Sequence, residues 1–196
     1  MVLNDVKLCA SSSGLALAIL VLVAVLLQGP AQAKDNNREV ASDPVYHEAT
    51  GSYFQVVRFA EAGAPPNWAN ARAAAGRKSY KGRRGRLAKI DNPAVHQFIG
   101  QELPRRGNAF IGLRFVCSTR QLVWLDGSTH QNGFAPWSRV WYRAVDNCAT
   151  SRVPFMPVMY TPQNRWTAQG PAKFLDYYIV EYPAVNEEQS LSAASD

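Results

Sequence analysis

Short apolar runs, several of them alternating with polar residues, recur along residues 52–183 and predict strands. In one segment two such runs flank a polar turn and end on Trp124, Asp126 and Gly127, which predicts a β-hairpin followed by an Asp-Gly turn. The expected strands lie within residues 52–59, 85–90, 109–127, 153–160 and 174–182.

Two segments between these strands have the composition and spacing of helices. Asn67 is a suitable N-cap for an alanine-rich run at residues 68–75. Pro93 suits the first turn of a second helix, whose apolar residues recur at three- and four-residue spacing until Leu103. The order of strands and helices predicts an α+β fold, with a long irregular region at residues 128–152.

The N-terminus has the pattern of a secretory signal peptide. Lys7 precedes an uncharged run at residues 14–27, and Ala31 and Ala33 form the small-x-small pattern of a cleavage site. We therefore expect residues 1–33 to be removed and the protein to be secreted, periplasmic or extracellular. The run is shorter than the roughly 20 residues of a membrane-spanning helix, so a retained anchor that contacts the membrane is the weaker alternative.

The remaining chain has the length of one domain with a hydrophobic core. Residues 34–51 are polar, and residues 184–196 are rich in Glu, Ser and Ala. Both segments are expected to be flexible, which leaves residues 52–183 as the folded domain.

The cysteines divide between the predicted signal and the predicted domain. Cys9 lies in the signal, whereas Cys117 and Cys148 stay in the exported chain. Two cysteines in an exported protein indicate one disulfide, and two buried free thiols are the alternative.

Four short motifs follow one another at residues 85–90 (Gly-Arg-Leu-Ala-Lys-Ile), 110–113 (Phe-Ile-Gly-Leu), 124–127 (Trp-Leu-Asp-Gly) and 178–181 (Tyr-Ile-Val-Glu). In this order they resemble the Gly-His-Leu-Ala-x-Ile, Trp-Ile-Gly-Leu, Trp-x-Asp-Gly and Phe-Ile-Cys-Glu motifs of the C-type lectin-like domain family. The resemblance covers nearly all of residues 52–183. It implies two helices beside a curved antiparallel sheet, with a long irregular loop region.

The family's calcium chemistry does not carry over to this chain. Sugar-binding members hold Ca²⁺ with oxygen ligands from a Glu-Pro-Asn or Gln-Pro-Asp tripeptide and from a Trp-Asn-Asp motif. Here Thr167 and Ala168 follow Trp166 in place of both oxygen donors, and Arg139 and Arg143 in the loop would repel Ca²⁺. We therefore expect no metal site, no cofactor and calcium-independent binding.

The resemblance also implies a specific disulfide. Cys148 lies near the position of the family's loop cysteine, but the usual partner after Trp166 is absent, which leaves Cys117. The family's other bridge is missing, since Val180 stands where a cysteine is expected.

Basic residues are concentrated between positions 72 and 106, where ten of them face two acidic residues, so this stretch carries more charge than the +6 of the whole chain. Such a patch would attract an anionic glycan, and a solvated basic face that only keeps the protein soluble is the alternative. Nucleic acid is disfavoured as a partner by export. The patch candidates are Arg77, Lys78, Lys81, Arg83, Arg84 and Arg86.

The long irregular region and the segment after it are rich in aromatic residues. Aromatic faces stack on sugar rings and arginines bind hydroxyls or carboxylates, whereas the alternative is that these aromatics only fix the loop. The candidates for ligand binding are Arg139, Trp141, Tyr142, Arg143, Tyr160 and Asn164.

Motifs of catalysis are not found in the sequence. The three histidines share no metal-ligand spacing, no nucleophile elbow occurs, and nothing in the sequence places a base beside Cys117. We therefore expect a noncatalytic module that binds carbohydrate or an anionic envelope glycan. The alternative is a protein-interaction or structural subunit of an envelope or extracellular complex that uses the same fold.

Overall fold

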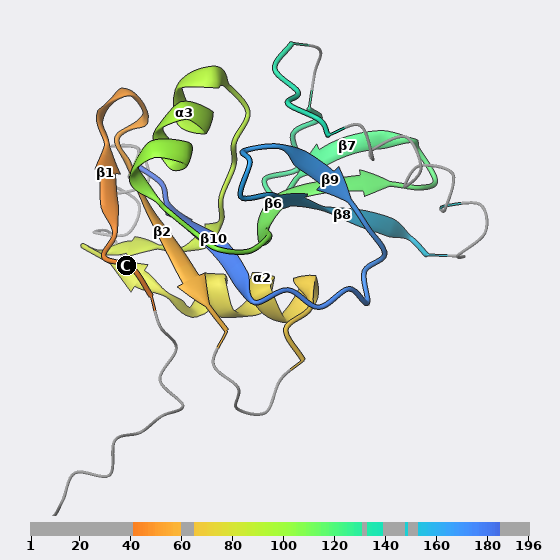
Figure 1. Ribbon diagram of the computed structural model, residues 1–196, viewed down its shortest axis with the longest axis horizontal. Helices are drawn as coiled ribbons and strands as arrows, with labels where there is room; N and C mark the ends of the chain where they lie inside the picture. The colour runs from red at the N-terminus through yellow and green to blue at the C-terminus, as the bar shows by residue number, and fades with distance from the viewer. Residues whose placement is uncertain (1–40, 60–64, 131–132, 139–147, 149–152, 185–196) are drawn as a thin grey trace, which may run out of the picture. The chain divides into compact units, whose positions relative to one another are not determined.

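The computed structural model describes residues 41–59, 65–130, 133–138, 148 and 153–184. In this part of the chain two helices pack against an 8-stranded sheet (Figure 1), and a two-stranded hairpin contacts the sheet without strand pairing to it. The helices are α2 (Trp68–Arg77) and α3 (Pro93–Glu102), with a 3-10 turn η1 at Glu48–Thr50. The sheet contains β1 (Val45–His47), β2 (Ser52–Arg58), β5 (Arg86–Leu87), β6 (Ala109–Val116), β7 (Gln121–Trp124), β8 (Phe155–Tyr160), β9 (Trp166–Ala168) and β10 (Tyr177–Tyr182). The separate hairpin pairs β3 (Ser79–Tyr80) with β4 (Arg83–Arg84).

The sheet has the order β1-β2-β10-β6-β8-β9, with β5 beside β10 and β7 beside β6. An antiparallel sheet was expected, and the ladders between described strands are antiparallel apart from one. β10 and β6 pair in parallel, with Tyr177 opposite Ala109. β10, the last strand, lies between β2 and β6 in the middle of the sheet. It runs antiparallel to β2 and parallel to β6, because these two strands run in opposite directions. The α+β class is confirmed, with a mixed sheet.

Both predicted helices are present, and each begins with an asparagine as its N-cap. The side chain of Asn67 accepts a hydrogen bond from the backbone N–H of Asn70 at 2.9 Å, and Asn92 does the same for Val95 at 3.0 Å. Pro93 occupies the first turn of α3, where its missing N–H costs no helical hydrogen bond.

The two helices cover opposite faces of β10. Successive side chains of a strand point to opposite faces, so neighbours in β10 enter different clusters. Ile179 packs in the cluster that contains Val95 of α3, whereas Val180 packs in the cluster that contains Trp68 of α2. Figure 1 shows α3 and α2 on either side of β2 and β10. The sheet therefore separates two hydrophobic cores.

The glycine of the Phe-Ile-Gly-Leu motif permits a close approach between β6 and the chain that follows β5. A Cβ atom built on Gly112 would lie 2.8 Å from the carbonyl oxygen of Leu87, and the Gly112 N–H donates to the Ala88 carbonyl at 2.9 Å. A side chain at this position would push the two backbones apart. The motif is thus explained by packing within the scaffold.

The predicted hairpin and disulfide are both confirmed. β6 pairs with β7 so that Leu113 faces Trp124, which is buried, and Gly127 adopts the positive φ of 86° that its turn requires. Cys117 forms a disulfide with Cys148, so the free-thiol alternative does not hold. The bridge ties the end of β6 to the long loop.

The folded sheet begins earlier than the sequence indicates. β1 lies within the segment expected to be flexible at residues 34–51, and it pairs with β2 through Tyr46 and Tyr53. β1 has only three residues, which is too few to show the alternation by which strands are recognised. Among the described residues no helix is long and apolar enough to cross a membrane. The predicted signal at residues 1–33 lies outside the described residues.

Candidate functional site

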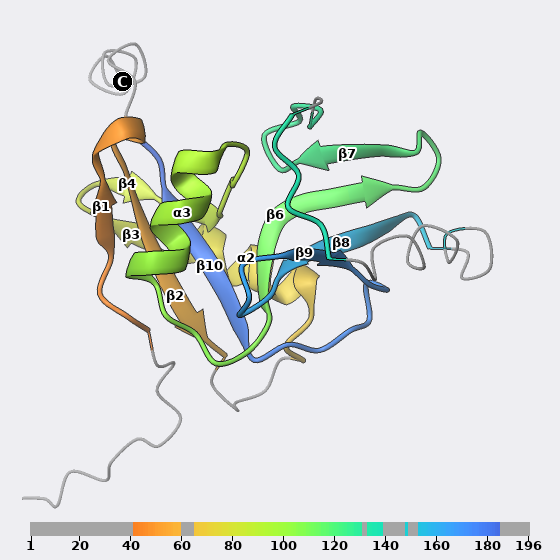
Figure 2. The ribbon, with the colours of Figure 1, turned by 45° about the horizontal axis from the view of Figure 1, so that its top comes forward.

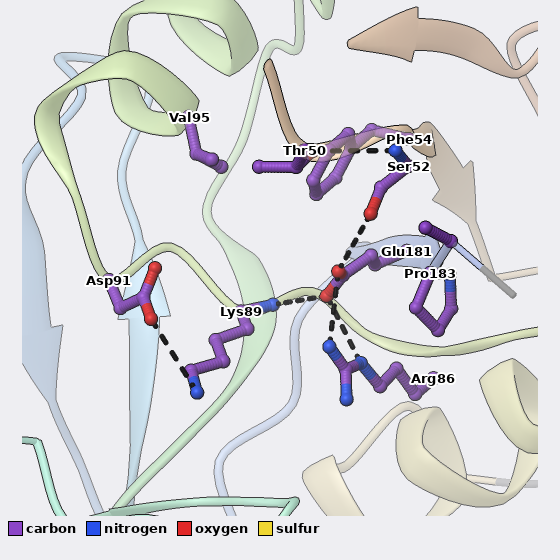
Figure 3. Close-up of a pocket in the computed structure, with 10 residues that line it drawn as sticks. Thr50, Ser52, Phe54, Arg86, Lys89, Asp91, Val95, Glu181 and Pro183 are labelled. Carbon is purple, nitrogen blue, oxygen red and sulfur yellow. Dashed lines mark hydrogen bonds and ion pairs between the residues drawn. The ribbon is translucent and has the colours of Figure 1, made fainter. Parts of the chain in front are cut away.

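A buried carboxylate organises the end of the sheet near η1 and the end of β10. Glu181 of β10 has a side chain only 7% exposed, and it accepts two hydrogen bonds at 3.1 Å from the Arg86 guanidinium. It also accepts from the Lys89 backbone N–H at 3.0 Å and from the Ser52 hydroxyl at 3.3 Å (Figure 3). These four bonds compensate the burial of the charge and hold β2, β5 and β10 together.

A cavity of about 500 Å³ lies beside this carboxylate. Figure 3 shows side chains from β2, α3, β10 and the segment after β5 pointing toward one another around it. Its lining combines apolar groups with hydroxyl, carboxylate and cationic groups, as small-molecule sites commonly do. Its lining includes Ser52, Phe54, Lys89, Asp91, Val95 and Pro183.

Lys89 connects the cavity to the hairpin of β6 and β7. Its Nζ lies 2.8 Å from the Asp126 carboxylate, 3.0 Å from the Ser128 hydroxyl and 3.5 Å from the Asp91 carboxylate. Burial alone would raise the pKa of Asp126, but hydrogen bonds from Lys89 and Ser128 outweigh it and lower the pKa well below its ordinary value.

This shift makes a prediction about acid stability. Because the pKa of Asp126 is lower in the folded protein, ionised Asp126 stabilises the fold. This contribution to the free energy of unfolding is fully present above the unfolded pKa of about 3.9 and is lost as the pH falls through the folded pKa. Ser128→Ala removes a 2.6 Å hydrogen bond to Asp126 and is expected to raise the carboxyl titration midpoint toward the ordinary value. NMR titration of the Asp126 side-chain carbonyl measures this, with Ser118→Ala as a control; an unchanged midpoint would show that Ser128 is irrelevant.

β3 and β4 approach β1 and β2 (Figure 2). Three tyrosines and two cations of these strands and their turn contact one another. The ring of Tyr53 lies 4.8 Å from that of Tyr46 and 5.0 Å from that of Tyr80. Lys81 Nζ lies 4.8 Å above the Tyr53 ring and donates to the Tyr53 hydroxyl at 3.0 Å, and the Arg83 guanidinium lies 5.1 Å from the same ring. The hydrogen bond to Tyr53 raises the pKa of Lys81, so the ammonium stays charged.

The predicted basic patch is only partly free to act on a ligand. Arg86 is committed to Glu181, so its charge is neutralised within the fold. Arg84 donates to the Gly76 carbonyl at 3.0 Å, and Arg83 donates to the carbonyl of Gly51, which are neutral acceptors. Among the described residues, no carboxylate forms an ion pair with the four cations that we call the basic hairpin, namely Arg77, Lys81, Arg83 and Arg84.

The ligand-binding candidates of the long loop are divided by the structure. Arg139, Trp141, Tyr142 and Arg143 lie outside the described residues. The two candidates that the structure describes are Tyr160 and Asn164, and both contact Arg105, which was not among the candidates.

Tyr160 and Asn164 are joined by Arg105. Tyr160 is fully buried, its hydroxyl lies 2.8 Å from Nδ1 of His96, and burial raises its pKa to about 12. The Arg105 guanidinium lies 4.2 Å from the Tyr160 ring and donates to Oδ1 of Asn164 at 3.2 Å. Tyr160 is thus packed in the core and turned away from solvent, because its strand β8 is covered by α3 on that side.

The described tryptophans of the late part of the chain form one edge-to-face cluster. Trp166 is fully buried, and its ring lies 6.0 Å from that of Trp124 and 5.2 Å from that of Trp137. Trp124 and Trp166 therefore belong to the hydrophobic core, and Trp137 packs against it. No three His, Cys, Asp or Glu side chains converge as a metal site within the part of the chain that is described.

The tyrosine cluster and the cavity are the features that sequence patterns missed. Tyr46 is 48% exposed, and the sequence pattern placed it in a segment expected to be flexible, outside the folded domain. Tyr53 and Tyr80 belong to different hairpins, and only their packing brings them together. The one local signal was Tyr80, a single aromatic residue among the basic residues of positions 77–86.

The chain was compared with known proteins. Neither a protein-family model nor a curated sequence matches it. The C-type carbohydrate-recognition domain of cow CD23, solved in the presence of a GlcNAc2Man3 oligosaccharide, superimposes with a TM-score of 0.52 at 15% identity, covering 76% of this chain and 100% of that one. Human lithostathine gives 0.51 at 13% identity over 80% and 99% of the chains. The mouse scavenger receptor C-type lectin domain gives 0.50 at 17% identity over 68% and 92%. At these identities the likeness concerns the fold, and the chain has a divergent C-type lectin-like fold.

Proposed function

We propose that the protein is an exported, noncatalytic module that binds an anionic glycan without calcium. The observation that carries this proposal is the basic hairpin: Arg77, Lys81, Arg83 and Arg84 have no carboxylate ion pair among the described residues. Two of these cations, Lys81 and Arg83, lie against the ring of Tyr53. Such a surface has an excess of positive charge and aromatic area in one place.

The chemistry of the basic hairpin favours an acidic polysaccharide. Guanidinium and ammonium groups bind carboxylate, sulfate and phosphate through charge-assisted hydrogen bonds. Tyrosine rings contribute flat apolar area for the C–H face of a sugar, and Tyr46 is the most exposed of the three. A glycan that carries acidic groups at intervals would satisfy both kinds of contact.

Calcium independence is supported by the segment where the family resemblance would place oxygen donors. The side chains of Thr167 and Ala168 in β9 carry no carboxylate or amide oxygen, and both residues are buried. We also propose a second contact region for the same glycan in the long loop. Aromatic rings stack on sugar rings and guanidinium groups bind acidic groups, and the candidates there are Arg139, Trp141, Tyr142 and Arg143.

Binding to a panel of immobilised polysaccharides tests the function. We expect retention on heparin, hyaluronan, polygalacturonate or lipopolysaccharide, much weaker retention on neutral dextran, and no change on adding a chelator. Raising the salt from about 0.15 M to about 1 M shortens the Debye length from about 8 Å to about 3 Å, so retention should be lost. Retention that needs Ca²⁺ would contradict calcium independence.

The same experiment addresses the protein-binding alternative. If no anionic polysaccharide is retained and a crosslinked envelope protein copurifies instead, the glycan proposal fails. The protein would then be an interaction or structural subunit that uses the same fold.

A further inference from the structure

The cavity beside Glu181 lies next to the basic hairpin but has different chemistry. We propose that it binds one uncharged pyranose unit of the glycan, an inference that rests on the proposed function. The site is built from η1, β2, the segment after β5, α3 and the end of β10 (Figure 3).

The charges of the cavity cancel within the protein. Its two cations are Arg86 and Lys89, and its two carboxylates are Glu181 and Asp91. Arg86 is paired with Glu181, and Lys89 is paired with Asp91 and with Asp126 outside the cavity. A carboxylate, sulfate or phosphate would meet no unpaired cation here, in contrast to the basic hairpin. The cavity is therefore suited to a neutral polar ligand.

Several polar atoms of the lining retain hydrogen-bonding capacity. The Asp91 side chain is 39% exposed, and its Oδ2 lies 3.5 Å from Lys89, which is longer than an ordinary hydrogen bond. Arg86 uses Nε and Nη2 on Glu181, and no described residue accepts from its Nη1. The Ser52 hydroxyl donates to Glu181 and keeps lone pairs that can accept. Adjacent hydroxyls of a sugar both donate and accept, so they can satisfy all three groups.

The lining also contains apolar side chains. Phe54 of β2, Val95 of α3 and Pro183 after β10 border the cavity (Figure 3). A pyranose presents hydroxyls at its edge and C–H groups on its face, which matches a lining with both kinds of group. The volume of about 500 Å³ lies within the range of about 300 to 1,000 Å³ that is usual for small-molecule sites.

The cavity and the basic hairpin share a structural element. Gly51 lies between Thr50 and Ser52, which both line the cavity, and its carbonyl accepts a hydrogen bond from Arg83 of the hairpin. A glycan with one unit in the cavity can therefore extend past η1 toward Arg83. In this arrangement the cavity selects a neutral sugar unit, and the basic hairpin attracts the acidic units beside it.

NMR titration of the purified protein with neutral methyl glycosides tests the inference. The probes are methyl glycosides of glucose, galactose, mannose, N-acetylglucosamine and rhamnose. At least one is expected to shift the backbone amides of Thr50, Ser52 and Asp91 in a saturable manner. No saturable shift with any of them, or shifts confined to residues away from the cavity, would overturn the inference.

Two matched variants locate the site. Ala184→Trp places a large side chain at the rim of the cavity and is expected to raise the dissociation constant at least about tenfold. Ala172→Trp changes another exposed alanine in the same way and should leave binding unchanged. Equal binding by both variants would overturn the cavity assignment. Asp91→Asn, which keeps the shape of the side chain, should weaken binding without unfolding the protein.

Retention on heparin, measured in parallel, separates this inference from the proposed function. Heparin retention without any neutral-sugar shift leaves the proposed function standing and removes the cavity site. Neutral-sugar binding at the cavity without retention on any anionic polysaccharide supports the cavity site and removes the anionic-glycan function.

Discussion

Glu181→Ala is expected to lower the free energy of unfolding by about 3 kcal/mol. The substitution leaves the Arg86 guanidinium without its carboxylate and leaves the Lys89 N–H and Ser52 hydroxyl without their acceptor. Arg86 is partly exposed, so water can compensate some of this loss, and the effect stays below that of a fully buried pair.

Denaturant unfolding followed by tryptophan fluorescence measures this effect, because Trp68, Trp124 and Trp166 are buried in the fold. Glu102→Ala, an exposed change at the end of α3, is the control and is expected to alter stability by less than about 0.5 kcal/mol. Similar losses in the two variants would mean that the Glu181 network contributes no more than a surface charge.

Replacing three cations of the basic hairpin is expected to weaken binding to heparin by about 100-fold. Arg77→Gln, Lys81→Gln and Arg84→Gln each remove an exposed charge, and an exposed charge pair contributes up to about 1 kcal/mol. Arg83 is kept, because its hydrogen bond to the Gly51 carbonyl holds η1 in place. The variant should also show a smaller dependence of affinity on salt, since fewer counterions of the polyanion are displaced.

A control with the same net charge separates local from general electrostatics. Arg106→Gln, Arg120→Gln and Lys173→Gln remove three exposed cations that lie outside the basic hairpin. Affinity for heparin, measured by calorimetry at two salt concentrations, should fall much less in this control. An equal fall in both triple variants would indicate attraction by the net charge of the protein, without a defined binding surface.

Local signals predicted much of the fold. The helix caps at Asn67 and Asn92 and the turn at Gly127 depend on residues a few positions away, so the sequence pattern was sufficient to place α2, α3 and the β6–β7 hairpin. The disulfide between Cys117 and Cys148 followed from the family resemblance, and the structure confirms it.

Roles that depend on long-range packing were harder to predict. Arg86 lies in a run of basic residues, but its charge is neutralised by Glu181, which is 95 positions away in the sequence. Tyr160 was a candidate because an aromatic ring can stack on a sugar, yet its strand places it beneath α3 in the core. In each case the partner that decides the role is distant along the chain.

By itself the sequence determined the α+β class, both helices, the main hairpin and the concentration of positive charge, because these properties arise from neighbouring residues. Only the tertiary structure decided which cations remain unpaired, where the tyrosines meet and that a charge-balanced cavity lies beside Glu181. The physical reason is strand register. The pairing of β10 with β2 and β5 brings residues from both ends of the domain within hydrogen-bonding distance, and no local pattern encodes that pairing.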